Sequence, residues 1–577
     1  MSVRRGHSRS VTRKLVDMAW PLGNTVFYVN DGHTHLEQAN IKRFSLKQLL
    51  CCWLYILLIG IQGCRGSSSG EPNTVNLTAN NAVRFAIEDD PRSLEPGLSV
   101  LMQDSVLALD LHVGLFRYDA ASVLNPYLVN SWQLSNDHRT FTFVLHDDWK
   151  WHNGRIITAY DVKKGWERYL NPRVGAWGAT YIGTISGAQE MIHGVATSLR
   201  GVEVVDSHTL KVTLAHPDPL FLLRLGAPPA WTVPPEAVVD GEPAWKGDPV
   251  GAGPFQFVLW QPHSRIVLKA NPHFAGDASS LNRLEFMIVP DLTTMLNMYR
   301  DGELDIAQVG VHELREVKQD AQLSEDIHSW PTAQLQFVGL NENRVAAFRD
   351  GRVRQALVLA VDRRSICERV LDGAWTPASE IVPEGVPGHL GENILAFDPA
   401  RARKLLADAG FPNARGFPVI SLVVAGTTES TAAEAMAAQL ADNLGIKMEV
   451  RRVEPGEFLA GLKQQRWDAF LTGWTADYLS AEQWLCRLLS SNGSTNYVGY
   501  RNARYEKILD DAMRAPTAEE QLPLWREANR MATADAALIP LGYGRFTYLV
   551  RPTISGFACN LFGPVGFEKV RKSVVRK

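Results

Sequence analysis

The chain has 577 residues, enough for several domains, and its 45% hydrophobic and 21% charged residues are ordinary globular fractions that exclude a wholly disordered chain, a collagen or a long coiled coil. Its 59 Lys and Arg against 62 Asp and Glu leave a net charge of −3, which argues against a nucleic-acid-binding protein, because such proteins carry an excess of basic residues. Six cysteines are too few for a disulfide scaffold of this length.

The first predicted element is an export signal. The apolar residues 49–61 follow a basic stretch that contains Lys42 and Lys47. They are fewer than the roughly 20 that a helix needs to cross a bilayer, and this layout is typical of a secretory signal peptide. Residues 61–64 read Ile-Gln-Gly-Cys and resemble a bacterial lipobox, which predicts cleavage before Cys64 and lipidation of that cysteine. An uncleaved signal anchor is the alternative.

Residues 1–63 are therefore predicted to be an N-terminal extension with a lipoprotein signal peptide. Residues 64–76, rich in Ser, Gly, Pro and Asn, are predicted to be a flexible tether. The chain contains no Cys-x-x-Cys, so neither a zinc ribbon nor a thioredoxin site is expected.

Strand-like and helix-like segments alternate from residue 83 onward, which predicts an α/β fold. The β-rich segment 140–145 places bulky apolar side chains on one face. A Thr followed three residues later by an Asp predicts a helix over 158–170. Further on, the sequence predicts a hairpin at 202–214, an Ala-rich amphipathic helix at 431–443 and a strand at 448–453.

Six short stretches follow one another in a characteristic order. They are Ser-Trp-Gln-Leu-Ser-Asn-Asp at 131–137, Trp-His-Asn-Gly at 151–154, Pro-Val-Gly-Ala-Gly-Pro-Phe at 249–255, Asp-Gly-Glu-Leu-Asp-Ile at 301–306, Ala-Val-Asp-Arg at 360–363 and Gly-Trp-Thr-Ala-Asp-Tyr at 473–478. Together they resemble the large peptide-binding solute receptors of ABC transporters, the oligopeptide/dipeptide-binding family. The resemblance covers roughly residues 83–570.

The resemblance implies an α/β, two-lobed, hinged fold of the periplasmic-binding-protein type with an additional third domain. Lobe I would combine 77–115, 247–330 and 545–577. The additional domain would be 116–246, and lobe II would be 331–544. The hinge is expected near residues 328–340 and 538–545.

The resemblance also implies a function. The chain would be an extracytoplasmic lipoprotein, in the periplasm or at the cell surface, that captures a peptide between its lobes and delivers it to the permease subunits of an ABC transporter. We expect a monomer that is held at the membrane through lipid on Cys64, with no nucleic-acid partner and no cofactor. The same scaffold serves nickel complexes, haem, opines and oligosaccharides, so a non-peptide solute is the alternative.

The resemblance assigns the ligand-binding role to three residues. Asp477 matches the amine-binding Asp of the family's Gly-Trp-x-x-Asp segment, and a buried carboxylate suits the ammonium group of a peptide. An Asp that caps a helix at 481–489 is the alternative. Trp474 is expected to stack on the ligand or to lie in the core, and Tyr543 to line the cleft.

Receptors of this family for longer peptides often carry an Arg just before the Gly-Trp segment, where it meets a ligand carboxylate. Residues 468–472 contain no Arg. The sequence therefore leaves the ligand's length, and the group that would meet its carboxylate, open.

No enzyme motif is found. The chain lacks Gly-x-Ser-x-Gly, the Walker loop and Gly-x-Gly-x-x-Gly, and the second His of a His-Glu-x-x-His zinc site does not follow His312 and Glu313. We therefore expect no catalytic residues and no metal. A secreted hydrolase of cell-envelope polymers is the alternative from another class, and it would need a nucleophile, a metal site or a carboxylate pair.

Overall fold

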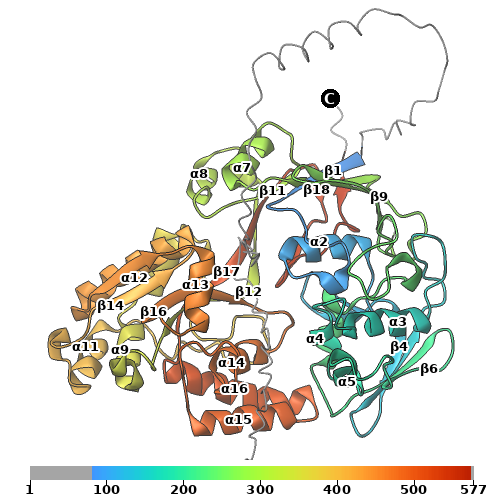
Figure 1. The fold of residues 1–577 in the computed structure, drawn as a ribbon. Coiled ribbons are helices and arrows are strands. Elements are labelled where there is room, and N and C mark those ends of the chain that lie inside the picture. The colour runs from blue at the N-terminus through green and yellow to red at the C-terminus, as the bar shows by residue number, and fades with distance from the viewer. Residues whose placement is uncertain (1–80, 278, 574–577) are drawn as a thin grey trace, which may run out of the picture. The chain divides into compact units, whose positions relative to one another are not determined.

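The computed structural model describes residues 81–277 and 279–573 (Figure 1). The predicted signal peptide, the predicted tether and Cys64 lie outside the described residues. Within the described ranges, no helix is both long and apolar enough to span a membrane. Helices and strands alternate along these ranges, so the α/β class predicted from the sequence is confirmed.

An 11-stranded mixed sheet is the largest sheet in the described part of the chain. Its order is β15-β14-β16-β12-β17-β11-β1-β10-β9-β8, with β13 paired to β17. Its strands are β1 (Ala82–Ile87), β8 (Phe255–Gln261), β9 (Arg265–Ala270), β10 (Arg283–Ile288), β11 (Ile306–Gln308), β12 (Ile327–Leu340), β13 (Trp375–Pro377), β14 (Ile420–Val424), β15 (Met448–Arg452), β16 (Ala469–Thr475) and β17 (Ile539–Val550).

Two long strands join the halves of this sheet. β12 and β17 pair with each other in antiparallel fashion, while β12 also pairs with β16 and β17 also pairs with β11. The register of the β12–β17 pair shifts between Pro331 and Leu335 and again between Gln336 and Phe337. Such irregularities bend and twist a strand locally. The lobe boundaries and a hinge motion in this pair stay predictions.

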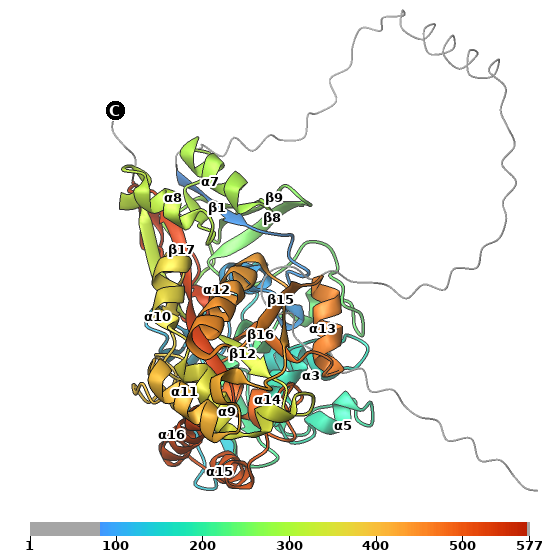
Figure 2. The ribbon, with the colours of Figure 1, turned by 90° about the vertical axis from the view of Figure 1, so that its left-hand side faces the viewer.

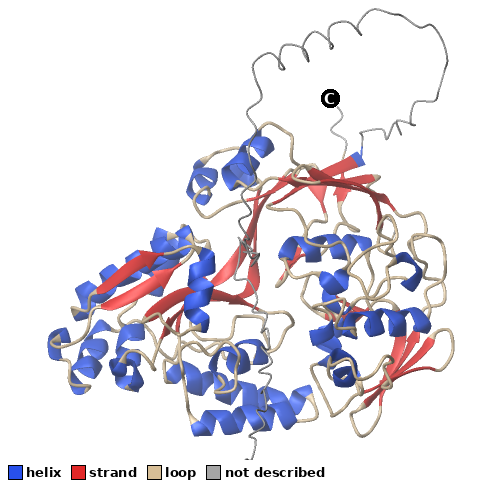
Figure 3. Cartoon of the chain, in the orientation of Figure 1, coloured by secondary structure: helices blue, strands red, loops and turns tan. Residues whose placement is uncertain are grey.

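A second sheet has the order β4-β5-β7-β6 and lies apart from the large one (Figure 3). Its strands are β4 (Val129–Leu134), β5 (Thr140–Leu145), β6 (Val202–Val204) and β7 (Thr209–Thr213). Two-residue or three-residue strands complete the list: β2 (Phe116–Tyr118), β3 (Leu124–Pro126), β18 (Ile554–Ser555), β19 (Cys559–Asn560), β20 (Gly563–Pro564) and β21 (Arg571–Lys572).

The helices differ widely in length. They are α2 (Met102–Leu111), α3 (Ala159–Leu170), α4 (Ala179–Ile182), α5 (Ala188–Ile192), α6 (Phe221–Leu225), α7 (Leu292–Arg300), α8 (Leu314–Gln319), α9 (Gly351–Leu359), α10 (Arg363–Ser365), α11 (Pro399–Asp408), α12 (Thr427–Leu444), α13 (Pro455–Lys463), α14 (Glu482–Leu489), α15 (Ala503–Arg514) and α16 (Ala518–Ala534). α12 packs on β14 and β15, and α11 packs between α9 and α12 (Figure 2).

Separate hydrophobic cores hold these layers together. One buried cluster draws almost all its residues from 113–252, around the four-stranded sheet and helices α3 to α6, with Tyr478 as the one member from far along the chain. Other clusters fill the two halves of the large sheet. These other clusters combine residues from distant parts of the chain, because the strands of the large sheet do so.

The locally predicted elements agree with the structure. The segment 140–145 is β5, and its buried residues alternate with partly buried ones. Thr158 caps α3, because its backbone N–H donates to Asp161 Oδ2 at 2.8 Å. The hairpin is β6 and β7, and 448–453 contains β15. α12 begins at Thr427, four residues earlier than predicted, after Gly426.

A buried histidine makes stability depend on pH. His112 is completely buried, its Nε2 lies 2.7 Å from the Leu94 carbonyl oxygen, and its ring stacks on Trp245. Burial lowers the pKa of His112 to about 4, because charging the ring there would remove an ion from water. Between that pKa and the value near 6.5 of an unfolded chain, the unfolded state binds more protons, so acid destabilises the fold.

We therefore expect His112→Gln, which keeps a donor for Leu94 but does not titrate, to change the pH profile of unfolding. Relative to this variant, the wild-type protein should lose about 2–3 kcal/mol of stability between about pH 7.5 and pH 4.5. Urea unfolding at each pH measures the difference. Parallel stability profiles for the two proteins would contradict a neutral buried His112.

Candidate ligand-binding site

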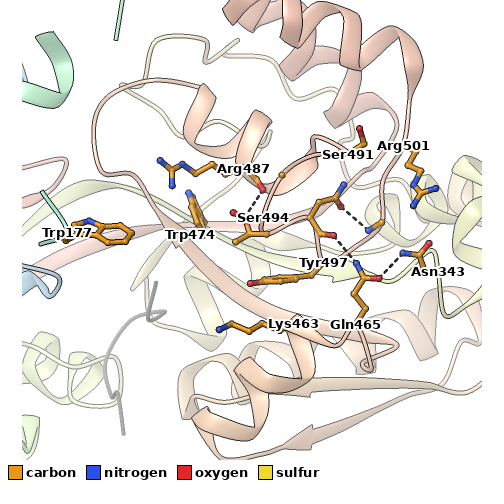
Figure 4. Close-up of a pocket in the computed structure, with 14 residues that line it drawn as sticks. Trp177, Asn343, Lys463, Gln465, Trp474, Arg487, Ser491, Ser494, Tyr497 and Arg501 are labelled. Atoms are coloured by element: carbon orange, nitrogen blue, oxygen red, sulfur yellow. Dashed lines mark hydrogen bonds between the residues drawn. The ribbon is translucent and has the colours of Figure 1, made fainter. Parts of the chain in front are cut away.

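A pocket of about 470 Å³ opens beside the end of β16 (Figure 4). Its lining is mostly polar, and all but one of its residues come from 343–501. The lining residues are Trp177, Asn343, Lys463, Gln465, Trp474, Arg487, Ser491, Gly493, Ser494, Thr495, Asn496, Tyr497, Gly499 and Arg501. The exception, Trp177, lies between α3 and α4, so the pocket is shared by segments that are far apart in the sequence.

Strand β16 places Trp474 in the pocket wall. Trp474 pairs with Leu335 of β12 and packs against the hydrophobic core behind the sheet. Its indole Nε1 is buried and has no hydrogen-bond partner among the described residues. At the neighbouring Gly473, a Cβ would lie 2.8 Å from the Gln336 side-chain amide, so a larger residue there would have to displace that amide.

Asp477 follows β16 and precedes α14. Its side chain is 6% exposed, and its nearest cation is Arg487, with 4.0 Å between Oδ2 and Nη2. Burial raises the pKa of Asp477 to about 7, the nearby charge of Glu482 adds to that rise, and Arg487 opposes it. No hydrogen bond to the carboxylate is found within the described ranges, so the charge is buried with incomplete compensation.

Asp477 does not cap the following helix. The N-cap of α14 is Ala481, and no side chain makes a capping hydrogen bond there. The backbone N–H of Asp477 instead donates to Gln483 Oε1 at 3.2 Å, so α14 fixes the loop that carries the carboxylate. The helix-capping alternative for Asp477 is therefore not what the structure contains.

The loop after β16 packs against the smaller sheet's helices. Burial, together with the charge of Asp477, raises the pKa of the Tyr181 hydroxyl on α4. The guanidinium of Arg224 on α6 lies 5.8 Å from the centre of the Tyr478 ring, and the Tyr478 hydroxyl donates to Glu482 Oε2 at 2.8 Å. Asp477 thus lies where α4 and α14 approach each other.

Tyr543 lies in the same row of the sheet as Trp474, because both pair with Leu335. Its hydroxyl donates to the Glu380 carbonyl oxygen at 2.9 Å, and its side chain belongs to the core behind β12 and β17. It is not among the residues that line the pocket. A contact between Tyr543 and a ligand stays a prediction.

The residues on the side of the pocket away from Trp474 were not predicted from the sequence. Asn496 shapes the loop there, since its side-chain amide donates to the carbonyl oxygens of Leu489, Ser490 and Tyr500. Gln465 donates to the Asn496 carbonyl and accepts from Asn343 (Figure 4). The Ser-, Asn- and Gly-rich composition of this segment indicates a loop. That the loop lines the same pocket as Trp474 depends on the tertiary fold, which the local sequence does not show.

The described residues offer neither a metal cluster nor a disulfide. No three His, Cys, Asp or Glu residues in the described part of the chain are grouped so that they could hold a metal ion. Cys367, Cys486 and Cys559 are free thiols, and burial raises the pKa of each. What the site provides is therefore a cavity with hydrogen-bonding and charged side chains.

Because the ionised Asp477 is poorly compensated, we expect Asp477→Asn to stabilise the ligand-free fold at alkaline pH. The folded pKa lies above the unfolded value, so the native state binds the extra proton and wild-type stability falls as pH rises toward 7. From about pH 5 to pH 8 the advantage of the Asn variant should grow by about 2–3 kcal/mol. Denaturant unfolding tests this, and a constant difference would contradict it.

The family model and the known proteins that match this chain agree on one kind of protein. The model for bacterial extracellular solute-binding proteins, family 5 Middle, matches residues 123–496. The periplasmic oligopeptide-binding protein OppA of Salmonella typhimurium is 28% identical over 532 residues, covering 90% of this chain and 96% of its own. Heme-binding protein A of Haemophilus influenzae is 26% identical, covering 88% of this chain and 96% of its own.

A solved structure agrees with these sequence matches. The unliganded open form of the periplasmic murein tripeptide-binding protein MppA superposes with a TM-score of 0.75 at 24% identity, covering 86% of this chain and 99% of that one. This likeness concerns the fold, and it confirms the two-lobed architecture that the sequence predicted.

Proposed function

The chain belongs to the bacterial extracellular solute-binding proteins of family 5, and we propose that it captures a peptide and passes it to an ABC permease. The family consists of binding proteins, so the chain is not an enzyme, and its relatives include periplasmic peptide-binding proteins. The names of these relatives support an extracytoplasmic location. Lipid on Cys64, a monomeric state and the permease partner are parts of the proposal.

The observation that carries the proposal is the buried carboxylate of Asp477. A carboxylate whose pKa is raised to about 7 by burial is costly to ionise, and an ammonium group of a ligand would offset that cost. The bond would be charge-assisted and therefore selective for a free amino terminus. A peptide meets this requirement regardless of its sequence.

Asp477 is not among the lining residues of the pocket, but it faces Arg487, which is. The pocket itself suits ligands that vary. Serine, threonine, asparagine and glutamine side chains make up much of its wall. Such groups can meet different ligand side chains through bridging water molecules. The constant part of the ligand would then be bound by Asp477, and the variable part would be accommodated with little selectivity.

Capture would couple to closure of the lobes. Trp177 and Trp474 both line the pocket, and they lie at the same end of it although they come from segments far apart in the sequence (Figure 4). A ligand that contacts both groups interacts more strongly with the closed form, and this differential contact shifts the population toward closure. The β12–β17 pair, with its two register shifts, is the segment in which the chain would bend.

Asp477→Asn should weaken binding of trialanine by about 2–4 kcal/mol, because the ammonium loses its only buried anionic partner. Calorimetry measures the loss. N-acetyl-trialanine should bind the wild-type protein as weakly as trialanine binds the variant. The matched control is Asp511→Asn, at an exposed carboxylate that pairs with Lys507 on α15.

Equal affinity of the wild-type and Asp477→Asn proteins for trialanine would reject the role of Asp477. Native mass spectrometry of protein purified without denaturation tests the ligand class itself. A bound peptide supports the proposal, whereas bound haem, a nickel complex, an opine or an oligosaccharide would replace it by the non-peptide alternative.

Peptide binding should also compact the protein, because the lobes approach each other around the ligand. Small-angle X-ray scattering with and without a bound peptide should show a smaller radius of gyration for the complex. The Asp477→Asn protein at the same peptide concentration is the control. Superimposable curves for free and saturated wild-type protein would contradict capture by closure.

A further inference from the structure

A second pocket lies against the β12–β17 pair, and it shares no lining residue with the first. Its volume is about 80 Å³. Since each molecule of liquid water takes about 30 Å³, the pocket holds a guest with the volume of roughly three water molecules. Its walls come from both predicted lobes, with Val309 on one and Gln334 on the other. The pocket is too small for a peptide, so any occupant belongs to another class of molecule.

The second pocket forms where the β12–β17 pair is irregular. Between Pro331 and Leu335, residues 332–334 of β12 lie opposite Gly544 alone of β17. Extra residues in one strand bend it locally away from a regular ladder. Gln334 and Gly544 both line the pocket, and Gly544 has no side chain that could fill the space. The cavity is therefore built into the strand pairing itself.

The wall of this pocket contains a cation without an anionic partner. Arg545 lines the pocket and forms no ion pair with any residue of the described ranges. Its Nε and Nη2 donate to the hydroxyl and the carbonyl oxygen of Ser329 at 2.9 and 3.3 Å, and its Nη1 donates to Thr376 Oγ1 at 3.3 Å. A guanidinium has five N–H groups, so two remain for a further acceptor. The three bonds to neutral oxygens hold the cation in place without compensating its charge.

An acidic residue close by in the chain is already used by another cation. Asp372 precedes the lining residue Ala374 by two positions. Its Oδ2 lies 3.0 Å from Nη2 of Arg315, and its carbonyl oxygen accepts from Lys318 Nζ at 2.5 Å. Both cations belong to α8, so this carboxylate is paired outside the pocket. The charge of Arg545 is therefore available to a guest.

Much of the remaining wall is apolar. Val309, Val311 and Leu314 come from the end of β11 and the start of α8, and Ala374 and Trp375 come from the start of β13. No acidic residue of the described ranges lines the pocket. Apolar walls favour a guest that brings apolar surface out of water. A multiply charged anion such as phosphate would meet one cation here and would lose its hydration on the other sides.

We propose that this hinge pocket is a separate binding site for a short-chain monocarboxylate such as acetate or propionate. The carboxylate would accept from the two free N–H groups of Arg545, and the alkyl part would lie against Val311, Leu314 and Trp375. One negative charge matches the one unpaired cation, and the volume limits the length of the chain. The site goes beyond peptide capture and does not depend on it.

Saturation-transfer NMR with sodium propionate tests the site directly, because it detects weak guests in fast exchange with the protein. We expect saturable transfer from the wild-type protein to propionate, and displacement by acetate. Propionamide has a similar shape without the charge and should bind at least about fivefold more weakly. Hexanoate is longer than the pocket allows and should also bind more weakly than propionate.

Two variants change the charge and the space separately. Arg545→Gln should weaken propionate binding at least about fivefold, because it removes the cation. Val311→Phe keeps Arg545 but fills the pocket from a partly buried position, so it should abolish saturable transfer. The matched control is Arg401→Gln, at an exposed arginine of α11 that forms no ion pair within the described ranges, and it should bind propionate as the wild type does. Urea unfolding shows that each variant is folded.

No saturable transfer to the wild-type protein would reject the site. Equal propionate affinity of the wild-type, Arg545→Gln and Val311→Phe proteins would place the binding elsewhere and overturn the assignment. Displacement of propionate by sodium chloride as effective as that by acetate would overturn the ligand class in favour of a general anion site. Trialanine calorimetry tests the proposed function separately, so a protein that binds propionate but no peptide would reject that function and keep this site.

Discussion

The proposed ligand site depends on a carboxylate that is held out of water without a close cation. Asp477 is buried beyond the end of β16, and Arg487 approaches it only to 4.0 Å. A salt bridge in direct contact would lower the pKa of the carboxyl, yet burial raises that pKa to about 7. In the proposed function, a cationic group of the ligand would offset the cost of ionising this carboxyl.

The surroundings of this carboxylate are fixed by rigid elements. β16 pairs along its whole length with β12, and Gln483 at the start of α14 accepts the Asp477 backbone N–H. On the other side, Tyr478 joins the core of the smaller sheet, where Arg224 lies over its ring. A site held by strand and helix ends keeps its geometry better than one on a free loop.

Much of this could be predicted from the sequence, and the rest could not for identifiable reasons. Strand alternation, helix caps and the ordered motifs were sufficient for the α/β class and for β5, α3 and the β6–β7 hairpin. Lys463 is different, because a lysine in the last turn of a helix is ordinarily explained by the helix dipole. Its place in the lining of the pocket arises only in the folded chain. For Tyr543 the sequence predicts a place in the cleft, whereas in the structure its hydroxyl donates to the Glu380 carbonyl oxygen within the core.

The cost of burying the Asp477 charge also accounts for affinity without side-chain selectivity. A receptor for peptides of many sequences gains little from any one ligand side chain, so its binding energy must come from groups that all peptides share. A desolvated carboxylate destabilises the ligand-free fold, and an ammonium that neutralises it recovers that free energy on binding. In the proposed function, the same interaction that lowers stability of the empty protein thus supplies the constant part of ligand affinity.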